Sequence, residues 1–283
     1  MTKKKIAWIT DSTAFITEDL KKHPDVYSVP LTITFSDNSF EDGVDLSTEE
    51  LYRRINQEKE VPKTSQPSAG KFAELLENLK DSYEQAIAIH VSSKLSGTMA
   101  SCLAAKEMTN FDMEVVDSKS MSYAITTLLY KGMELAREGF SMKDIANKLQ
   151  EETQRSENYI LLGSLDQFYK GGRMSGTQYL LGNILQIKPI IRINQEGEFQ
   201  LFEKVRSAKK ALQRILSLLQ EARAKAVVKE VQIMHGNVLE RAQELESIVR
   251  NLFPDMKVVI GEISSTIAVH AGEGTVAIIW HNE

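Results

Sequence analysis

The sequence predicts an α/β fold divided into two domains. Short apolar runs alternate with longer stretches in which apolar residues recur at helical spacing, a pattern typical of α/β proteins with largely parallel strands. At 283 residues the chain exceeds the roughly 100–200 residues of an ordinary domain. A polar stretch, Glu151–Asn158, separates two such alternating series. We therefore expect one domain at residues 1–155 and a second at residues 156–283.

The first domain is expected to alternate strands with amphipathic helices. Apolar runs predict strands at Lys5–Thr10, Val26–Phe35, Gln85–Val91 and Met113–Val116. Helical spacing predicts helices at Ser47–Glu58, Ser68–Leu79, Thr98–Met108, Ser120–Ala136 and Ser141–Gln154. Pro67 and Ser68 favour a helix start at that position, because serine caps free backbone N–H groups and proline lacks one. Gly139 is suited to end the helix before it.

The second domain is expected to hold more strands than the first. Apolar runs predict strands at Tyr159–Gly163, Ile187–Ile193, Glu198–Phe202, Glu230–His235, Lys257–Glu262 and Thr275–Trp280. Asn194–Gly197 has the composition of a hairpin turn. Helices are expected at Ser207–Ala224, which carries a clear apolar stripe opposite a solvated basic side, and at Val238–Asn251. Leu165–Gly182 is a segment broken by Gly171–Gly172, and Ser264–Gly274 is a turn-rich connection.

Composition excludes several classes of function. A net charge of −5 argues against a nucleic-acid partner, because such domains normally carry a basic surplus. No apolar run approaches the roughly 20 residues that a membrane span needs. The basic start is followed by too short an apolar run for a signal peptide, and the single cysteine, Cys102, fits a reducing compartment, so we expect a soluble cytoplasmic protein. The five histidines show no metal-ligand spacing, so no structural metal site is expected.

Two hydroxyl-rich turns are the strongest candidates for a binding site. Thr64–Ser68 and Ser92–Thr98 each precede a predicted helix, where unpaired N–H groups and the helix dipole attract anions. Capping by Ser68, and by Ser96 or Gly97, accounts for only part of these hydroxyls. The pattern indicates a pocket for a carboxylate or a phosphate.

Four further segments admit either a binding role or a purely structural one. Asp11–Thr13 ends the first strand, where ligands of open α/β sheets collect, but it also suits a capping turn before Thr17–Lys22. Lys170–Gly176 combines glycines with two cations and could wrap an anion, or simply end a helix. Arg206 could hold a carboxylate or form a surface ion pair. A lone histidine such as His270 could donate to an anion or be satisfied locally.

Taken together, the motifs resemble the DegV family along the whole chain. Any one of them is common, but their order and spacing are specific. The matching segments are Asp11–Ala14, Pro30–Leu31, Lys63–Ser68, Ser92–Thr98, Val116–Ser118, Lys170–Arg173, Lys188–Ile190 and Lys204–Arg206.

The resemblance implies a three-layer α/β/α domain with a mainly parallel sheet, then a two-layer α/β domain with a mixed sheet, and a long-chain fatty acid such as palmitate, stearate or oleate between them. It implies that Thr64, Ser65, Ser96 and Gly97 hold the acyl carboxylate. His270, Arg173 and Arg206 match members or neighbours of the same headgroup network. No catalytic residue and no metal are implied, and the fatty acid is a ligand rather than a cofactor.

Two positions depart from the family pattern. Phe15 stands where an acidic residue is usual after the Asp-Ser-Thr-Ala motif, and we expect it to pack in the interior. Glu273 stands where a proline is usual in the turn after His270. A carboxylate there could repel an anionic product or a kinase-bound phosphate.

The first functional hypothesis is a carrier that presents its fatty acid to a separate ATP-dependent fatty acid kinase, with at most transient contact with a membrane surface. The chain itself has neither a P-loop nor a Gly-x-Ser-x-Gly elbow. A second hypothesis is an enzyme, either a hydrolase using Ser96 with His270 or a phosphoryl-transfer subunit similar in fold to dihydroxyacetone kinase. The third is a regulator that senses lipid.

Overall fold

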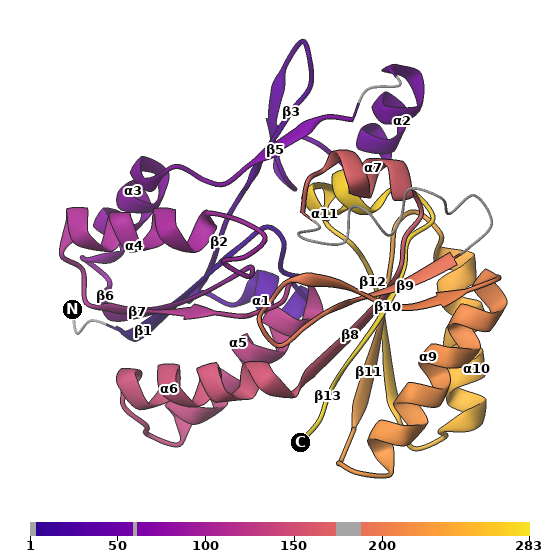
Figure 1. Cartoon of the computed structure of the whole chain (residues 1–283). Coiled ribbons are helices and arrows are strands. Elements are labelled where there is room, and N and C mark those ends of the chain that lie inside the picture. The colour runs from indigo at the N-terminus through magenta and orange to yellow at the C-terminus, as the bar shows by residue number, and fades with distance from the viewer. Residues whose placement is uncertain (1–3, 59–60, 174–187) are drawn as a thin grey trace.

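Residues 4–58, 61–173 and 188–283 are described by the computed structural model, and in them the strands form two large sheets and one small sheet (Figure 1). The strands of the first large sheet all precede residue 118, and those of the second all follow residue 155. The expected division into residues 1–155 and 156–283 would fall between a short 3₁₀ helix, Thr153–Arg155, and the first strand of the second sheet. That exact boundary stays a prediction.

The first large sheet is wholly parallel and lies between two layers of helices. Its order is β2-β1-β6-β7, with β1 at Lys4–Asp11, β2 at Val26–Val29, β6 at Tyr83–His90 and β7 at Met113–Asp117. Figure 1 shows α3 (Ala69–Leu79) and α4 (Thr98–Thr109) over one face, and α5 (Tyr123–Arg137) and α6 (Met142–Glu152) over the other. A short helix, α1, covers Glu18–Lys22. The expected three-layer arrangement is confirmed.

The alternation of side chains along each strand explains why the first large sheet packs against helices on both of its faces. In β1, Ala7 and Ile9 join the apolar cluster beneath α3 and α4, where Cys102 is also buried, as expected. Trp8 points the other way and joins the cluster that contains α5 and α6. Because side chains alternate along a strand, a run that is apolar at every position can pack on both faces.

The second large sheet is mixed and carries helices on one face. Its order is β10-β9-β8-β13-β11-β12, and only the pairing of β11 with β12 is parallel. The strands are β8 at Ser156–Leu161, β9 at Lys188–Ile193, β10 at Phe199–Val205, β11 at Glu230–His235, β12 at Lys257–Glu262 and β13 at Val276–His281. Helices α9 (Ala208–Arg223) and α10 (Leu239–Leu252) cover one face (Figure 1). The expected two-layer domain with a mixed sheet is confirmed.

The opposite face of this sheet joins the first domain. Tyr159 of β8 and Ile278 of β13 pack in the cluster beneath α9 and α10. Their neighbours Ile160 and Ile279 belong instead to the large cluster that also holds Trp8 and Leu129 of the first domain. One apolar cluster therefore spans both domains.

Two sequence-based expectations were wrong. Val26–Phe35 is not one strand, because Pro30, which lacks a backbone N–H, separates β2 from β3 (Thr32–Thr34). Strand β3 pairs instead with β4 (Ser39–Glu41) and β5 (Lys63–Ser65) in the small sheet, beside α2 (Thr48–Glu58). The stretch expected to be turn-rich, Ser264–Gly274, contains a helix, α11 (Ser265–Ala271), whose N-cap is Ser264.

Another short helix, α7, spans Leu165–Lys170. The rest of the predicted Leu165–Gly182 segment, from residue 174 onward, lies outside the described residues.

The expected hairpin turn at Asn194–Gly197 connects β9 to β10 and touches the first domain. Ser92 Oγ donates a 2.8 Å hydrogen bond to the carbonyl oxygen of Gly197. Gly197 has a φ of +86°, and a Cβ at this position would lie 2.2 Å from Ser92 Oγ. A glycine is therefore needed both for the backbone conformation and for the contact.

We expect Gly197→Ala to destabilise the protein more than Gly139→Ala. Gly139 also has a positive φ, +90°, but a Cβ there would meet no atom within 4 Å. Both substitutions carry the left-handed backbone penalty of roughly 1–2 kcal/mol, and Gly197→Ala adds an overpacking cost of about 1–3 kcal/mol against Ser92. Urea unfolding of both variants measures the difference. Equal losses of unfolding free energy would contradict a close contact at this hairpin.

Candidate functional site

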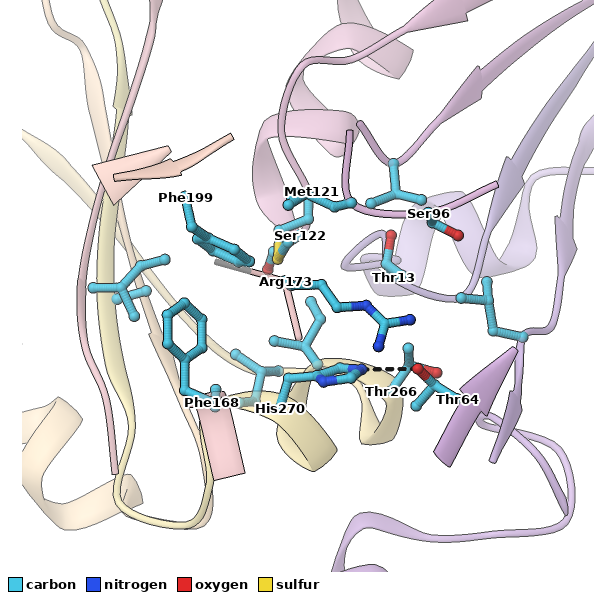
Figure 2. A pocket seen from close by; sticks show the side chains of 18 of the residues that line it. Thr13, Thr64, Ser96, Met121, Ser122, Phe168, Arg173, Phe199, Thr266 and His270 are labelled. Carbon is cyan, nitrogen blue, oxygen red and sulfur yellow. Dashed lines mark hydrogen bonds between the residues drawn. The ribbon is translucent and has the colours of Figure 1, made fainter. Parts of the chain in front are cut away.

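A cavity of about 310 Å³ lies where the free face of the mixed sheet meets the first domain. This volume is at the lower end of the roughly 300–1,000 Å³ typical of ligand pockets. The cavity wall is largely apolar, and among its members are Ile160, Leu162, Phe168, Phe199, Met234 and Ile279. Figure 2 shows Phe168 and Phe199 on one side of the cavity, and Thr64, Ser96 and Arg173 gathered toward the other.

A hydrogen bond between the two domains marks the polar end of the cavity. Thr64, in β5, and His270, in α11, are joined through Oγ1 and Nε2 at 2.8 Å (Figure 2). Burial, reinforced by the nearby positive charge of Arg173, lowers the pKa of His270 to about 4. The ring is therefore neutral at pH 7, and its Nδ1 atom is buried with no hydrogen-bond partner in the described part of the chain.

Arg173 extends its guanidinium into this polar end (Figure 2). Its Nη1 atom donates a 2.6 Å hydrogen bond to the carbonyl oxygen of Gly171. Burial lowers the pKa of Arg173, because a charged group loses hydration in the interior. Among the described residues no carboxylate forms an ion pair with it. A half-buried cation without an acidic partner is suited to an anionic ligand.

The backbone around Gly171 is packed against the histidine. A Cβ at Gly171 would lie only 2.3 Å from His270 Nδ1, so a side chain larger than hydrogen would displace the ring. Of the predicted Lys170–Gly176 segment, Lys170 is exposed and pairs with Asp166 at 2.8 Å. Residues 174–176 lie outside the described residues. Arg173 thus lines the cavity and Gly171 packs against His270, whereas Lys170 faces solvent.

Asp42 fixes the helix that carries His270. Its carboxylate oxygens accept hydrogen bonds from the backbone N–H groups of Ser265 and Thr266, at 3.1 and 3.2 Å. Ser12 Oγ donates to the same carboxylate at 2.9 Å. Burial raises the pKa of Asp42, although these hydrogen bonds oppose the shift. This buried carboxylate was not singled out from the sequence, because its partners are far away along the chain.

The two hydroxyl-rich turns meet at the cavity. Thr64, Ser65, Ser96 and Gly97 all line it. A Cβ at Gly97 would lie 2.6 Å from Gln66 Nε2, so the first turn packs directly on the second. The structure therefore brings together these four residues with His270 and Arg173, six of the seven residues expected at the site.

Other hydroxyls of the turns have structural partners. As predicted, Ser68 caps α3 by accepting a hydrogen bond from the backbone of Lys71. Ser93 Oγ donates to Asp117 at 2.5 Å. Ser96 Oγ lies 2.8 Å from Thr98 Oγ1 and accepts a longer hydrogen bond from the backbone of Thr98.

The Asp11–Thr13 motif is mainly structural. The buried carboxylate of Asp11 accepts hydrogen bonds from Thr13, from the backbone of Val91 and from His90 Nδ1. Burial lowers the pKa of His90, but the hydrogen bond to Asp11 and the nearby thiol of Cys102 outweigh this and raise the pKa to about 9. Of the three motif residues, Thr13 lines the cavity.

Arg206 is placed elsewhere, which corrects the expectation that it joins the headgroup network. It is exposed after the end of β10 and is not among the described residues that line the cavity. The next residue, Ser207, caps α9, which covers the face of the sheet opposite the cavity. The chain at Arg206 is therefore already turning away from the site.

The two departures from the family pattern have local roles. Phe15 is partly buried and stacks on Tyr123 with ring centroids 5.7 Å apart, so the expected packing role is confirmed. Glu273 accepts hydrogen bonds from Asn56 and Asn237 at 3.2 and 2.6 Å. Its carboxylate is thereby drawn to polar side chains outside the described lining of the cavity.

Within the described ranges, no cluster of three or more His, Cys, Asp or Glu side chains is arranged to hold a metal ion. The same residues include no helix that is both long and apolar enough to span a membrane.

The fold and the cavity define a two-domain α/β protein with a largely apolar cavity between its domains. The sequence profile of the family described as "Uncharacterised protein, DegV family" matches residues 5–283. The chain therefore belongs to the DegV family.

Solved structures show the same architecture. A fatty acid binding DegV family protein from Streptococcus agalactiae is 30% identical, with a TM-score of 0.92 and complete coverage, 100%, of both chains. DegV from Bacillus subtilis, described as a fatty acid binding protein, is 31% identical with a TM-score of 0.90, over 98% of this chain and 99% of that one. The fatty acid kinase (Fak) B3 protein of Streptococcus pneumoniae, solved with linoleic acid, has a TM-score of 0.84 over 99% of this chain and 100% of its own; at 22% identity this likeness shows the fold alone.

In the ligand-free protein we expect His270 to titrate with a pKa of about 4 rather than its ordinary 6.5. Because the unfolded chain then binds the proton more readily, folding stability should fall as the pH drops from 6.5 toward 4. NMR titration of the imidazole protons measures the pKa. Arg173→Met should raise this pKa only partly, since burial is the larger cause. A wild-type pKa of 6.5 would contradict the buried, neutral ring.

Proposed function

We propose that this protein binds a long-chain fatty acid, such as palmitate, stearate or oleate, in the cavity between its domains. The carboxylate lies among Thr64, Ser65, Ser96, Gly97, His270 and Arg173. The observation that carries the proposal is the combination of a largely apolar cavity wall with one polar end that holds a half-buried cation and several hydroxyls. That combination matches an amphiphile with one anionic end.

Burial of the hydrocarbon chain can supply most of the affinity. About 14 methylene groups at about 0.8 kcal/mol each give a transfer free energy of roughly 11 kcal/mol, before the entropy of association is subtracted. The polar end then has only to replace the hydration of the carboxylate. Hydroxyls, backbone N–H groups and one guanidinium can do so together.

Because His270 is neutral, Arg173 is the residue that balances the negative charge of the ligand carboxylate. With a pKa of about 4, the imidazole contributes a hydrogen bond but no charge at pH 7. Thr64 already shares a hydrogen bond with His270 Nε2, so these two side chains are oriented before the ligand arrives. Arg173 then neutralises the carboxylate while its Gly171 contact holds it in place.

The carrier presents the bound carboxylate to a separate ATP-dependent fatty acid kinase, which forms the acyl phosphate. Support comes from the fatty acid binding relatives and from the shared fold of the Fak B3 protein. On this proposal the protein works in the cytoplasm as a carrier rather than as an enzyme. It has no nucleic-acid partner and contacts membranes only transiently.

The hydrogen bonds at the polar end do not favour a hydrolase using Ser96 with His270. Ser96 Oγ is paired with Thr98, whereas His270 Nε2 is paired with Thr64. A histidine with a pKa of about 4 is also a weak general base at neutral pH. The carrier proposal needs no base, because the chemistry takes place on the kinase.

We expect protein purified from cells to carry a long-chain fatty acid in equimolar amount. Native mass spectrometry measures the bound mass, and organic extraction followed by gas chromatography identifies the chain. Buried methylenes make dissociation slow enough for the ligand to survive purification. Recovery of ligand-free protein that also fails to take up added palmitate, stearate or oleate would count against the proposal.

We expect Arg173→Gln to weaken palmitate binding by about 10- to 100-fold, because a hydrogen bond to a charged group is worth about 1.5–3 kcal/mol. Arg206→Gln is the matched control, since it removes the same charge outside the described lining of the cavity. Displacement of a fluorescent fatty acid gives both affinities. Equal weakening in the two variants would indicate a general charge effect, and no loss in either would remove Arg173 from the site.

A further inference from the structure

The apolar cavity contains a buried polar side chain away from its polar end. Asn158 of β8 lines the cavity and is only 3% exposed. Its Oδ1 atom is buried and has no hydrogen-bond partner among the described residues. Its Nδ2 atom makes one long contact, 3.4 Å, with Ser120 Oγ. Most buried polar atoms in proteins are paired, so an unpaired amide oxygen at a cavity wall points to a partner in the ligand.

Asn158 lies at the opposite end of the β8 cavity face from His270. Asn158, Ile160 and Leu162 alternate onto the cavity face of β8 and its extension, and they span about 13 Å at a rise of about 3.3 Å per residue. The chain after Leu162 reaches the polar end, because Ser164 donates its backbone N–H to the carbonyl of Ala271, next to His270. At the other end, Asn158 faces Ile279 across the β8–β13 pairing.

Beyond Asn158 the surroundings become polar. A second hollow, of about 440 Å³, is lined by polar side chains that include Lys119, Arg192 and Gln200. Asn158 lines both this hollow and the apolar cavity. At its far end the apolar cavity is therefore bounded by the amide of Asn158, and a polar cleft lies on the other side of that amide.

The chemistry of the amide selects the matching ligand group. Exchanging Oδ1 and Nδ2 by rotating the amide leaves unpaired donors instead of an unpaired acceptor. A hydroxyl can either donate to Oδ1 or accept from Nδ2, so it matches both orientations. A second carboxylate would bring a charge that the described cavity wall at this end does not balance, which makes it the poorer match.

We propose that Asn158 forms a subsite for a hydroxyl group at the far end of the bound chain, so that the protein accepts ω-hydroxylated long-chain fatty acids. This inference rests on the proposed function and adds a ligand class to it. An unmodified chain leaves the Oδ1 atom of Asn158 without a partner, whereas a terminal hydroxyl can donate a hydrogen bond to it.

The test compares palmitate with ω-hydroxypalmitate by isothermal titration calorimetry on delipidated protein. In Asn158→Leu, a buried hydroxyl would find no partner. We expect the preference for ω-hydroxypalmitate over palmitate to fall by about tenfold relative to wild type. Asn158→Val, whose β-branched side chain suits a strand, repeats the test if the leucine variant folds poorly. Gln232→Leu is the matched control, because it removes a buried amide from the same sheet outside the described cavity lining.

Each outcome separates the two proposals. A tenfold loss of preference in the Asn158 variants, with no change in Gln232→Leu, supports the subsite. Palmitate binding with the same preference in all variants overturns the subsite but leaves the fatty acid carrier standing. Failure of wild type to bind either acid overturns the carrier proposal, and the subsite with it.

Discussion

The two-sided packing of the mixed sheet is the constraint on which the rest of the structure depends. Tyr159 and Ile278 face α9 and α10, whereas Ile160 and Ile279 face the first domain. Strand alternation allows only these two faces, so the second domain buries one set of apolar side chains against its own helices and another against its neighbour. The cavity lies on the face of the sheet that packs against the first domain. Its wall is apolar because it is part of the contact between domains.

The polar end depends on contacts that cross between the domains. Thr64 belongs to the small sheet of the first domain, and His270 belongs to a helix of the second. Asp42, also from the first domain, holds the start of that helix by two backbone hydrogen bonds. Separation of the domains would therefore open the hydrocarbon wall and dismantle the carboxylate site together.

Local sequence patterns predicted the layers of the fold well, because the periods of strands and helices are local properties. They failed where pairing is long-range. Strands β3, β4 and β5 have three residues each, too few to show alternation, and they exist because they pair with one another across the chain. Helix α11 was missed because its seven residues are too few to show helical periodicity, and its β-branched residues have a low helix propensity.

The residues of the site also divide into those that local sequence patterns predict and those that only the folded structure reveals. The hydroxyl turns could be found from Thr64 and Ser96, because excess hydroxyls before a helix are a visible pattern. No sequence pattern distinguishes Arg173 from Arg206. Only the folded structure shows that Arg173 lines the cavity and that Arg206 is exposed outside its described lining. Asn158 looked like part of a polar boundary between domains, and its role at the cavity appears only once β8 is paired with β13.

A crystal structure with palmitate brominated at its last carbon tests the central claim most directly, because anomalous scattering locates bromine independently of the fitted chain. The account predicts one bromine peak beside Asn158 and Ile279, with the carboxylate density between Thr64 and Arg173. A peak at the Thr64 end would reverse the ligand, and a peak outside the cavity would contradict the account altogether.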